Sequence, residues 1–180
     1  AKRIRVIKPR IGGGFGGKQE ILIEDVAAHL TIATGRPVRY EYTREEEFTA
    51  SRSRHPMRVR MKTGVKRDGT ITANAMYCLS DTGAYGCHAL TVTGNTGHKS
   101  MALYPGARSR ETGEMPNIRF YADIVYTNTP PAGAYRGYGV PQGYVPLDTH
   151  LQWIAREMGW DALEFRLKNS LKAGNEHPFS

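Results

Sequence analysis

The sequence predicts an α+β fold in which a β-hairpin contributes to a mixed sheet and helices pack against that sheet. Apolar and polar residues alternate over residues 57–66 and 70–79, and turn-forming residues separate these two segments. Apolar residues recur at helical spacing over 19–33 and 147–158. No linker or internal repeat divides the chain, so we expect a single domain over residues 1–180.

The composition is that of a folded globular chain. Its 180 residues are 39% hydrophobic and 23% charged, which excludes a disordered chain and allows a substantial core. There is no run of about 18 apolar residues, so we expect no membrane-spanning helix and no membrane partner. The two cysteines, Cys78 and Cys87, are too few for a disulfide framework and predict reduced thiols and a cytoplasmic location.

The formal net charge of +8 raises the alternative of a basic nucleotide- or nucleic-acid-binding module. The basic residues are dispersed along the chain, however, and no nucleic-acid recognition motif accompanies them. An anionic cofactor or an acidic partner explains the charge equally well. We therefore favour a protein without a nucleic-acid partner and keep the binding module as the alternative.

Three elements are predicted before the hairpin: a strand over 3–8, a helix over 19–33 and a short strand over 38–42. The first strand follows from apolar residues set among basic ones. The helix follows from apolar residues at i, i+3, i+4 and i+7. Thr43 and Glu46 then form the pattern of a capping box, which predicts a helix start.

After the hairpin, residues 81–117 are rich in Gly, Ser and Thr and predict a long irregular segment with a functional role. Residues 118–127 predict another strand, and residues 130–143 a second glycine-punctuated loop. Residues 147–158 predict a helix that ends before a glycine. A last helix is expected over 161–169, with an aspartate as its N-cap.

The first glycine loop, residues 12–17, lies between a predicted strand and a predicted helix. Glycine permits close approach of backbone N–H groups to a ligand, and a helix N-terminus favours an anion. The spacing matches the GxGxxG pattern, but Phe15 stands where small residues are usual. A phosphate loop of the Walker type is excluded, because Lys18 is followed by Gln19. The glycines alone fit a structural turn as well as an anion site.

The second glycine loop places one guanidinium, that of Arg136, and two aromatic rings among glycines. Glycine on both sides of Tyr138 removes bulk, so a planar ligand could lie against its ring. Arg136 can donate hydrogen bonds to an oxyanion or an oxo group. The alternative from this loop alone is a solvated arginine beside two core tyrosines.

Together the two loops carry a resemblance. GGGFGGKQ at 12–19 and AYRGYGVPQG at 134–143 resemble the molybdenum-binding (large) subunit of the xanthine dehydrogenase/aldehyde oxidase family of molybdenum hydroxylases. The stretch over 116–137 is similar to the family's approach to the second motif, and residues 161–169 to its D-x-x-x-x-R-x-x-N pattern. The resemblance implies part of a molybdopterin-binding domain.

Members of this family oxidise a carbon beside nitrogen in a heterocycle, or an aldehyde carbon, with oxygen derived from water. The resemblance implies a molybdenum–molybdopterin cofactor, often extended as a cytosine dinucleotide in bacteria. It also implies iron–sulfur clusters and FAD on other domains or subunits. These subunits and the remaining segment of the molybdenum subunit are the expected partners.

The resemblance assigns four residues to the cofactor. Gly14, Phe15 and Gly16 would place backbone amides beside the molybdenum ligands. Arg136 would stand in the second loop close to the metal, so Phe15 and Arg136 are the residues expected nearest to molybdenum.

Two further residues would face substrate. Gln19 stands where purine-oxidising members have a glutamate, and Tyr138 where a phenylalanine stacks on the substrate ring. Glutamine carries no charge, and the tyrosine hydroxyl needs a polar partner. Tyr104 or His98 lies near the place of a substrate-binding arginine, although we expect Tyr104 to serve packing.

No catalytic residue is assigned within this sequence. The family's catalytic glutamate lies beyond a region like 161–180, and neither Glu157 nor Glu164 has the context of a base. We therefore expect one piece of a larger cofactor-binding unit, which alone does not turn over substrate. A further alternative is an inactive fragment that folds only with its partner.

Overall fold

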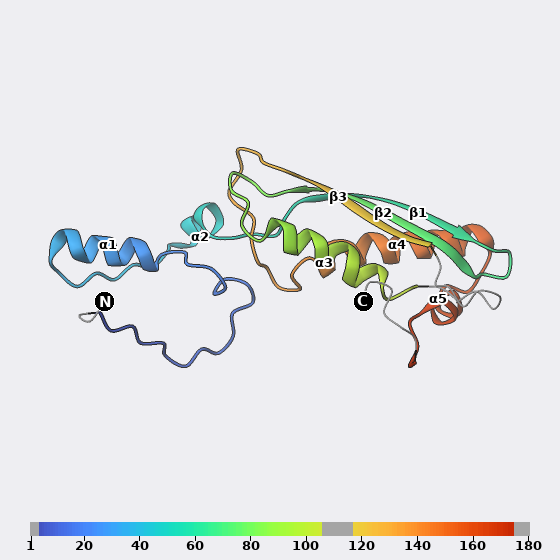
Figure 1. The fold of residues 1–180 in the computed structure, drawn as a ribbon, viewed down its shortest axis with the longest axis horizontal. Coiled ribbons are helices and arrows are strands. Elements are labelled where there is room, and N and C mark those ends of the chain that lie inside the picture. Colours follow the sequence, from blue (N-terminus) through green and yellow to red (C-terminus); the bar gives the residue numbers. More distant parts are fainter. Residues whose placement is uncertain (1–3, 106–116, 175–180) are drawn as a thin grey trace.

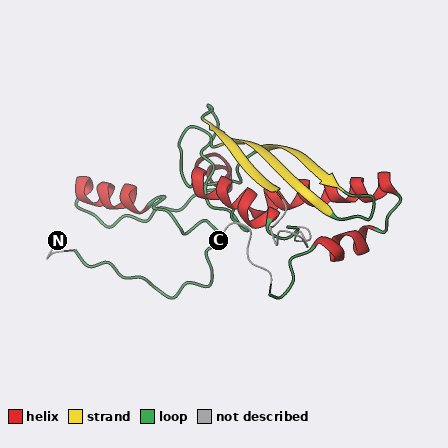
Figure 2. Ribbon diagram, turned by 45° about the vertical axis from the view of Figure 1, so that its right-hand side comes forward, coloured by secondary structure: helices red, strands yellow, loops and turns green. Residues whose placement is uncertain are grey.

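The computed structural model describes residues 4–105 and 117–174, and its α+β architecture confirms the predicted fold class (Figures 1 and 2). The elements in chain order are α1 (Glu24–Thr34), α2 (Arg44–Ala50), β1 (Met57–Val65), β2 (Ile71–Asp81), α3 (Ala89–Met101), β3 (Asn117–Val125), α4 (Val140–Met158) and α5 (Ala162–Asn169). Helices α3 and α4 lie under one face of the sheet, and α1 lies far from it (Figure 1). No described helix is long and apolar enough to cross a bilayer.

The sheet is mixed, as predicted, with the strand order β1-β2-β3. β1 and β2 form the predicted antiparallel hairpin, in which Met57 pairs with Ser80, and β3 runs parallel to β2. Side chains along β1 alternate between exposed and half-buried, because its basic residues face solvent. The hairpin turn is closed by a hydrogen bond from the amide of Lys66 to the carbonyl of Thr70, 2.9 Å long.

The core lies between the sheet and the helices beneath it. Its buried cluster consists of Ile71, Met76, Met101, Tyr104, Leu147, Leu151, Ala155 and Phe165. Glycine lets α3 approach its neighbours: a Cβ on Gly97 would lie 2.2 Å from the Phe120 ring, and one on Gly143 would lie 1.9 Å from the Thr96 carbonyl oxygen. The tight contact of α3 with β3 and α4 therefore depends on these two glycines.

The C-terminal helix is fastened to the hairpin turn by polar side chains. Asp161 caps α5 as predicted and accepts hydrogen bonds from two backbone amides of the first turn. The buried amide of Asn169 accepts from the Ile71 amide and donates to the carbonyls of Gly69 and Phe165, each at 2.8 Å. The D-x-x-x-x-R-x-x-N pattern thus serves the fold at both its ends.

Two predicted strands are wrong. The described residues of 3–8 and all of 38–42 form no strand. Apolar side chains such as Val6 are exposed there, and in the described part of the chain no sheet edge pairs with either segment. An alternating pattern predicts a strand only where a partner completes the hydrogen bonds.

Three helices also differ from expectation: one was not predicted, and two begin at other residues than predicted. Residues 81–117 were expected to be irregular, yet 89–101 form α3, because packing outweighs the poor helix propensity of its glycines. Residues 106–116 of that segment lie outside the described residues. Helix α4 starts at Val140, inside the predicted loop, and α1 starts at Glu24, later than predicted. The capping box at the start of α2 is confirmed.

Candidate functional site

The first glycine loop has a left-handed backbone at three positions. The φ angles are +134° at Gly13, +51° at Phe15 and +107° at Gly16. Only glycine adopts such angles freely, so the conformation of Phe15 is imposed by its surroundings. The Lys18 ammonium donates to the Gly13 carbonyl at 2.8 Å and closes the loop. This turn leaves the Phe15 ring 69% exposed beside the backbone.

The second glycine loop contains three consecutive left-handed residues: Gly137, Tyr138 and Gly139, with φ of +94°, +43° and +92°. Gly139 lies against α3, where a Cβ would come within 2.1 Å of the Val92 carbonyl oxygen. The Thr96 hydroxyl donates to the Gly139 carbonyl at 3.0 Å. The loop is therefore held on the first turns of α3.

The two loops meet in space. A Cβ on Gly16 would lie 2.2 Å from the carbonyl oxygen of Ala134, so the two backbones are in direct contact. The guanidinium carbon of Arg136 lies 5.6 Å from the centre of the Phe15 ring. The structure thus brings together Phe15 and Arg136, the two residues expected nearest to the metal. Gly14 lies in the same turn, where its carbonyl accepts from the Gly17 amide.

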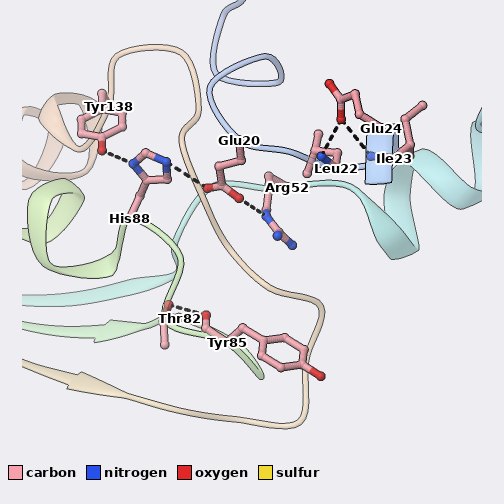
Figure 3. Close-up of polar contacts among 9 residues, drawn as sticks. All are labelled: Glu20, Leu22, Ile23, Glu24, Arg52, Thr82, Tyr85, His88 and Tyr138. Atoms are coloured by element: carbon pink, nitrogen blue, oxygen red, sulfur yellow. Dashed lines mark hydrogen bonds and ion pairs between the residues drawn. The ribbon is translucent and has the colours of Figure 1, made fainter. Parts of the chain in front are cut away.

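The two residues expected to face substrate have different surroundings. Gln19 is exposed at the end of the first loop, where its backbone N–H donates to the Gly16 carbonyl. Tyr138 is half-buried, and its hydroxyl contacts His88 (Figure 3). The same hydroxyl also contacts Thr91 in the first turn of α3. Tyr104 lies in the core as expected, and burial, together with a hydrogen bond to a second tyrosine, raises the pKa of Tyr104 to about 12.

A polar cluster that the sequence did not predict joins the loops (Figure 3). The Glu20 carboxylate accepts from the Arg52 Nε at 2.6 Å and lies 3.1 Å from the His88 Nε2. The side chains of Glu20 and Arg52 are only 13% and 17% exposed, so this ion pair is shielded from water. Arg52 also packs against the backbone of Gly133. The only feature of the sequence that could have indicated this cluster is the position of Glu20 directly after the first motif.

Arg54 is a second residue that sequence analysis missed. Its guanidinium donates to the Arg136 carbonyl at 2.6 Å and to the Gln142 side chain at 3.0 Å, and it lies 4.6 Å from the centre of the Tyr135 ring. It therefore ties together three residues of the second loop. The segment that carries Arg54 pairs with this loop through a bridge between Ser53 and Ala132, which no local pattern predicts.

Burial shapes the ionisation of a histidine beside the cluster. His55 is only 1% exposed, and this burial lowers the pKa of His55 below its ordinary value. The nearby Asp81 carboxylate opposes the effect. His55 is therefore neutral under ordinary conditions. Among residues 4–105 and 117–174, no three His, Cys, Asp or Glu side chains gather as metal ligands.

The loops offer hydrogen-bond donors to a planar, oxygen-rich group. The backbone amides of Phe15 and Gly16 donate to no other described residue. The Arg136 guanidinium is exposed beside them, and Lys18 adds a second positive charge in the same turn. Amides and cations of this kind suit phosphate, oxo groups and the carbonyl edge of a ring system.

Comparison with known proteins gives consistent matches. A family model described as the molybdopterin cofactor-binding domain matches residues 1–170. The probable hypoxanthine oxidase XdhD of Escherichia coli K12 is 44% identical over 174 residues, which cover 97% of this chain and 17% of that protein. The nicotinate dehydrogenase large molybdopterin subunit of Eubacterium barkeri is 36% identical over 172 residues, which cover 96% of this chain and 38% of that protein.

The fold has solved counterparts as well. Aldehyde oxidoreductase from Desulfovibrio gigas superposes with a TM-score of 0.82 at 32% identity, over 93% of this chain and 18% of that one. The chain therefore spans well under half the length of these relatives.

Proposed function

This chain belongs to the molybdopterin cofactor-binding domain family, in the molybdenum subunits of xanthine dehydrogenase and aldehyde oxidase enzymes, and we propose that it supplies part of the cofactor and substrate site of a molybdenum hydroxylase. One observation carries the proposal: the exposed turn at Phe15 and the Arg136 guanidinium lie together, although the chain separates them widely. A planar metal–pterin group needs donors that converge from several directions, and these two loops supply them.

The residues present fit that group. The amides of Phe15 and Gly16 have no described partner in the chain, and Gly14 keeps the turn free of bulk. In our proposal Gly14, Phe15, Gly16 and Arg136 hold the molybdenum end of the cofactor. The cofactor, when bound, supplies the redox chemistry, while this chain supplies position and positive charge.

We propose an N-heterocycle or an aldehyde as the substrate, oxidised with oxygen derived from water. The relatives include a probable hypoxanthine oxidase, a nicotinate dehydrogenase and an aldehyde oxidoreductase, and these names support the two classes. Gln19 would contact the substrate edge as an uncharged donor and acceptor. Tyr138 would pack its ring against the substrate plane.

The rest of the enzyme would come from outside these residues. We propose that the catalytic glutamate lies in another segment of the molybdenum subunit. Iron–sulfur clusters and FAD on other domains or subunits would carry the electrons away, and the pterin would have the cytosine dinucleotide form. A cytoplasmic location agrees with the two free cysteines, Cys78 and Cys87.

The test uses the whole protein that carries this chain, purified as isolated. We expect molybdenum and pterin in amounts close to one per protein, and turnover in H₂¹⁸O that places ¹⁸O in the product. Arg136→Ala should lose molybdenum and lower kcat/KM on the order of 10²-fold, because it removes a charged donor from the cofactor. Arg58→Ala, on the exposed outer face of β1, is the matched control and should keep both. Normal metal content and turnover in Arg136→Ala would remove Arg136 from the site.

A further inference from the structure

We propose that His88, oriented by Glu20, is a positioning residue that fixes the ring of Tyr138 for packing against a planar substrate. The three side chains form a line from the first glycine loop, through the start of α3, to the second glycine loop (Figure 3). The inference rests on the proposed function, because that function places Tyr138 at the substrate.

The two nitrogens of His88 have different neighbours. Glu20 Oε1 lies 3.1 Å from Nε2, a charge contact without hydrogen-bond geometry. The Tyr138 hydroxyl is hydrogen-bonded to Nδ1. In our proposal the carboxylate favours the tautomer with the proton on Nε2, so that Nδ1 accepts and the phenol donates. Arg52 donates a hydrogen bond to the other carboxylate oxygen of Glu20, and this bond fixes the position of the Glu20 side chain.

A second contact completes the hydrogen bonding of the Tyr138 oxygen. The Thr91 hydroxyl lies 2.7 Å from that oxygen and 3.1 Å from the carbonyl of His88. The Thr91 hydroxyl donates to the His88 carbonyl, so its contact with the phenol oxygen is a second polar contact at the same end of the ring. Tyr138 therefore presents a ring face rather than a free hydroxyl, and its selectivity depends on shape and stacking.

The backbone of Tyr138 shows why such support is needed. Its φ of +43° is disfavoured for any residue with a side chain, and a glycine with positive φ flanks it on each side. Flexible neighbours cannot hold the ring, so the contacts at its hydroxyl end must do so. The ring of His88 meets that of Tyr138 edge to face, with the centres 5.5 Å apart. His88 also has a left-handed backbone, with φ of +52°.

The test compares substitutions that each keep one of the two contacts of His88, the one with Tyr138 or the one with Glu20, and remove the other. His88→Asn keeps an acceptor near the Nδ1 position, and asparagine tolerates a left-handed backbone. His88→Gln keeps a donor near the Nε2 position and loses the acceptor toward Tyr138. Tyr138→Phe removes the hydroxyl and keeps the ring, and Tyr126→Phe, on an exposed tyrosine beyond β3, is the matched control.

The variants are made in the whole protein, and the dissociation constants of hypoxanthine, nicotinate, quinoline and benzaldehyde are measured calorimetrically without an electron acceptor. We expect Tyr138→Phe and His88→Gln to bind the preferred compound on the order of threefold to tenfold more weakly. In separate steady-state assays with an electron acceptor, KM should change more than kcat. His88→Asn should keep most of the affinity. The double variant His88→Gln/Tyr138→Phe should bind no more weakly than either single one, because both remove the same contact.

Melting temperatures identify a variant that merely fails to fold. Wild-type affinity in folded His88→Gln, or additive effects in the double variant, would overturn the inference and leave the proposed function standing. A wild-type protein that holds no molybdopterin and binds none of the four compounds would overturn the proposed function, and the inference with it.

Discussion

The guanidinium of Arg136 lies over the ring of Phe15, with 5.6 Å between its central carbon and the ring centre. Each residue belongs to a glycine-rich loop. In the chain, the loop with Phe15 comes before the three strands of the sheet and the loop with Arg136 comes after them. Their contact depends on Gly16, whose backbone touches that of Ala134. The convergence of the two loops is the geometric basis of the proposed cofactor site.

Gly16→Ala should separate the two loops. A Cβ at this position would lie 2.2 Å from a backbone oxygen, and the φ of +107° is strained for alanine. We expect about 2 kcal/mol or more of destabilisation, and loss of molybdenum from the whole protein. The measurements are the melting temperature and the metal content. Gly12→Ala is the control, because nothing lies within 4 Å of a Cβ there; equal effects of both variants would contradict the contact.

Gly97→Ala should weaken the packing of α3 on the sheet. Its Cβ would overlap the Phe120 ring at 2.2 Å, so we expect a loss of about 1–3 kcal/mol, measured by chemical denaturation. Gly94→Ala lies in the same helix with open space around the Cβ, and should stabilise it by up to about 1 kcal/mol. The prediction is contradicted if the two variants shift stability in the same direction.

Asn169→Asp should detach α5 from the hairpin turn. The amide nitrogen of Asn169 donates to the carbonyls of Gly69 and Phe165, and a carboxylate would repel both oxygens. We expect a loss of about 3 kcal/mol or more, since the group is buried. Asn128→Asp, on an exposed asparagine, should change the melting temperature little. A stable Asn169→Asp protein would show that the turn is held by other contacts.

Acid should destabilise the protein through His55. Burial lowers the pKa of His55 in the folded protein, so below about pH 6.5 the unfolded chain takes up a proton there that the folded chain does not. The stability due to this residue is present above that pH and is lost as the pH falls. His55→Gln should therefore flatten the fall of melting temperature between pH 7.5 and pH 5. His29→Gln, on an exposed helix residue, should leave the slope unchanged, and equal slopes in all three proteins would refute the assignment.

The local elements that were predicted correctly are those whose signals are contained in a few neighbouring residues. The hairpin, the capping box at Thr43 and the Asp161 cap each depend on hydrogen bonds over a short stretch of chain. The strands expected over 3–8 and 38–42 failed because a strand also needs a partner. Helix α3 escaped prediction because its glycines serve packing against other elements.

In the candidate site, too, the residues of local motifs could be predicted and the contacts between distant residues could not. The two motifs alone pointed to the glycine loops and to Phe15, Arg136, Gln19 and Tyr138. Sequence analysis could not show that His88 would supply the partner that the Tyr138 hydroxyl needs. The pairing of residue 53 with residue 132, which brings Arg54 to the second loop, is equally invisible in a single sequence.

The sequence by itself determined the family, the glycine loops and the residue types available for chemistry, because backbone freedom and side-chain donors are properties of single residues. Only the tertiary structure decided which of these residues touch. Contacts between loops depend on how the sheet and α3 hold them, as the approach of Gly16 to Ala134 and the line from Glu20 to Tyr138 show. Such contacts arise from packing across the whole domain, and no local stretch of sequence encodes them.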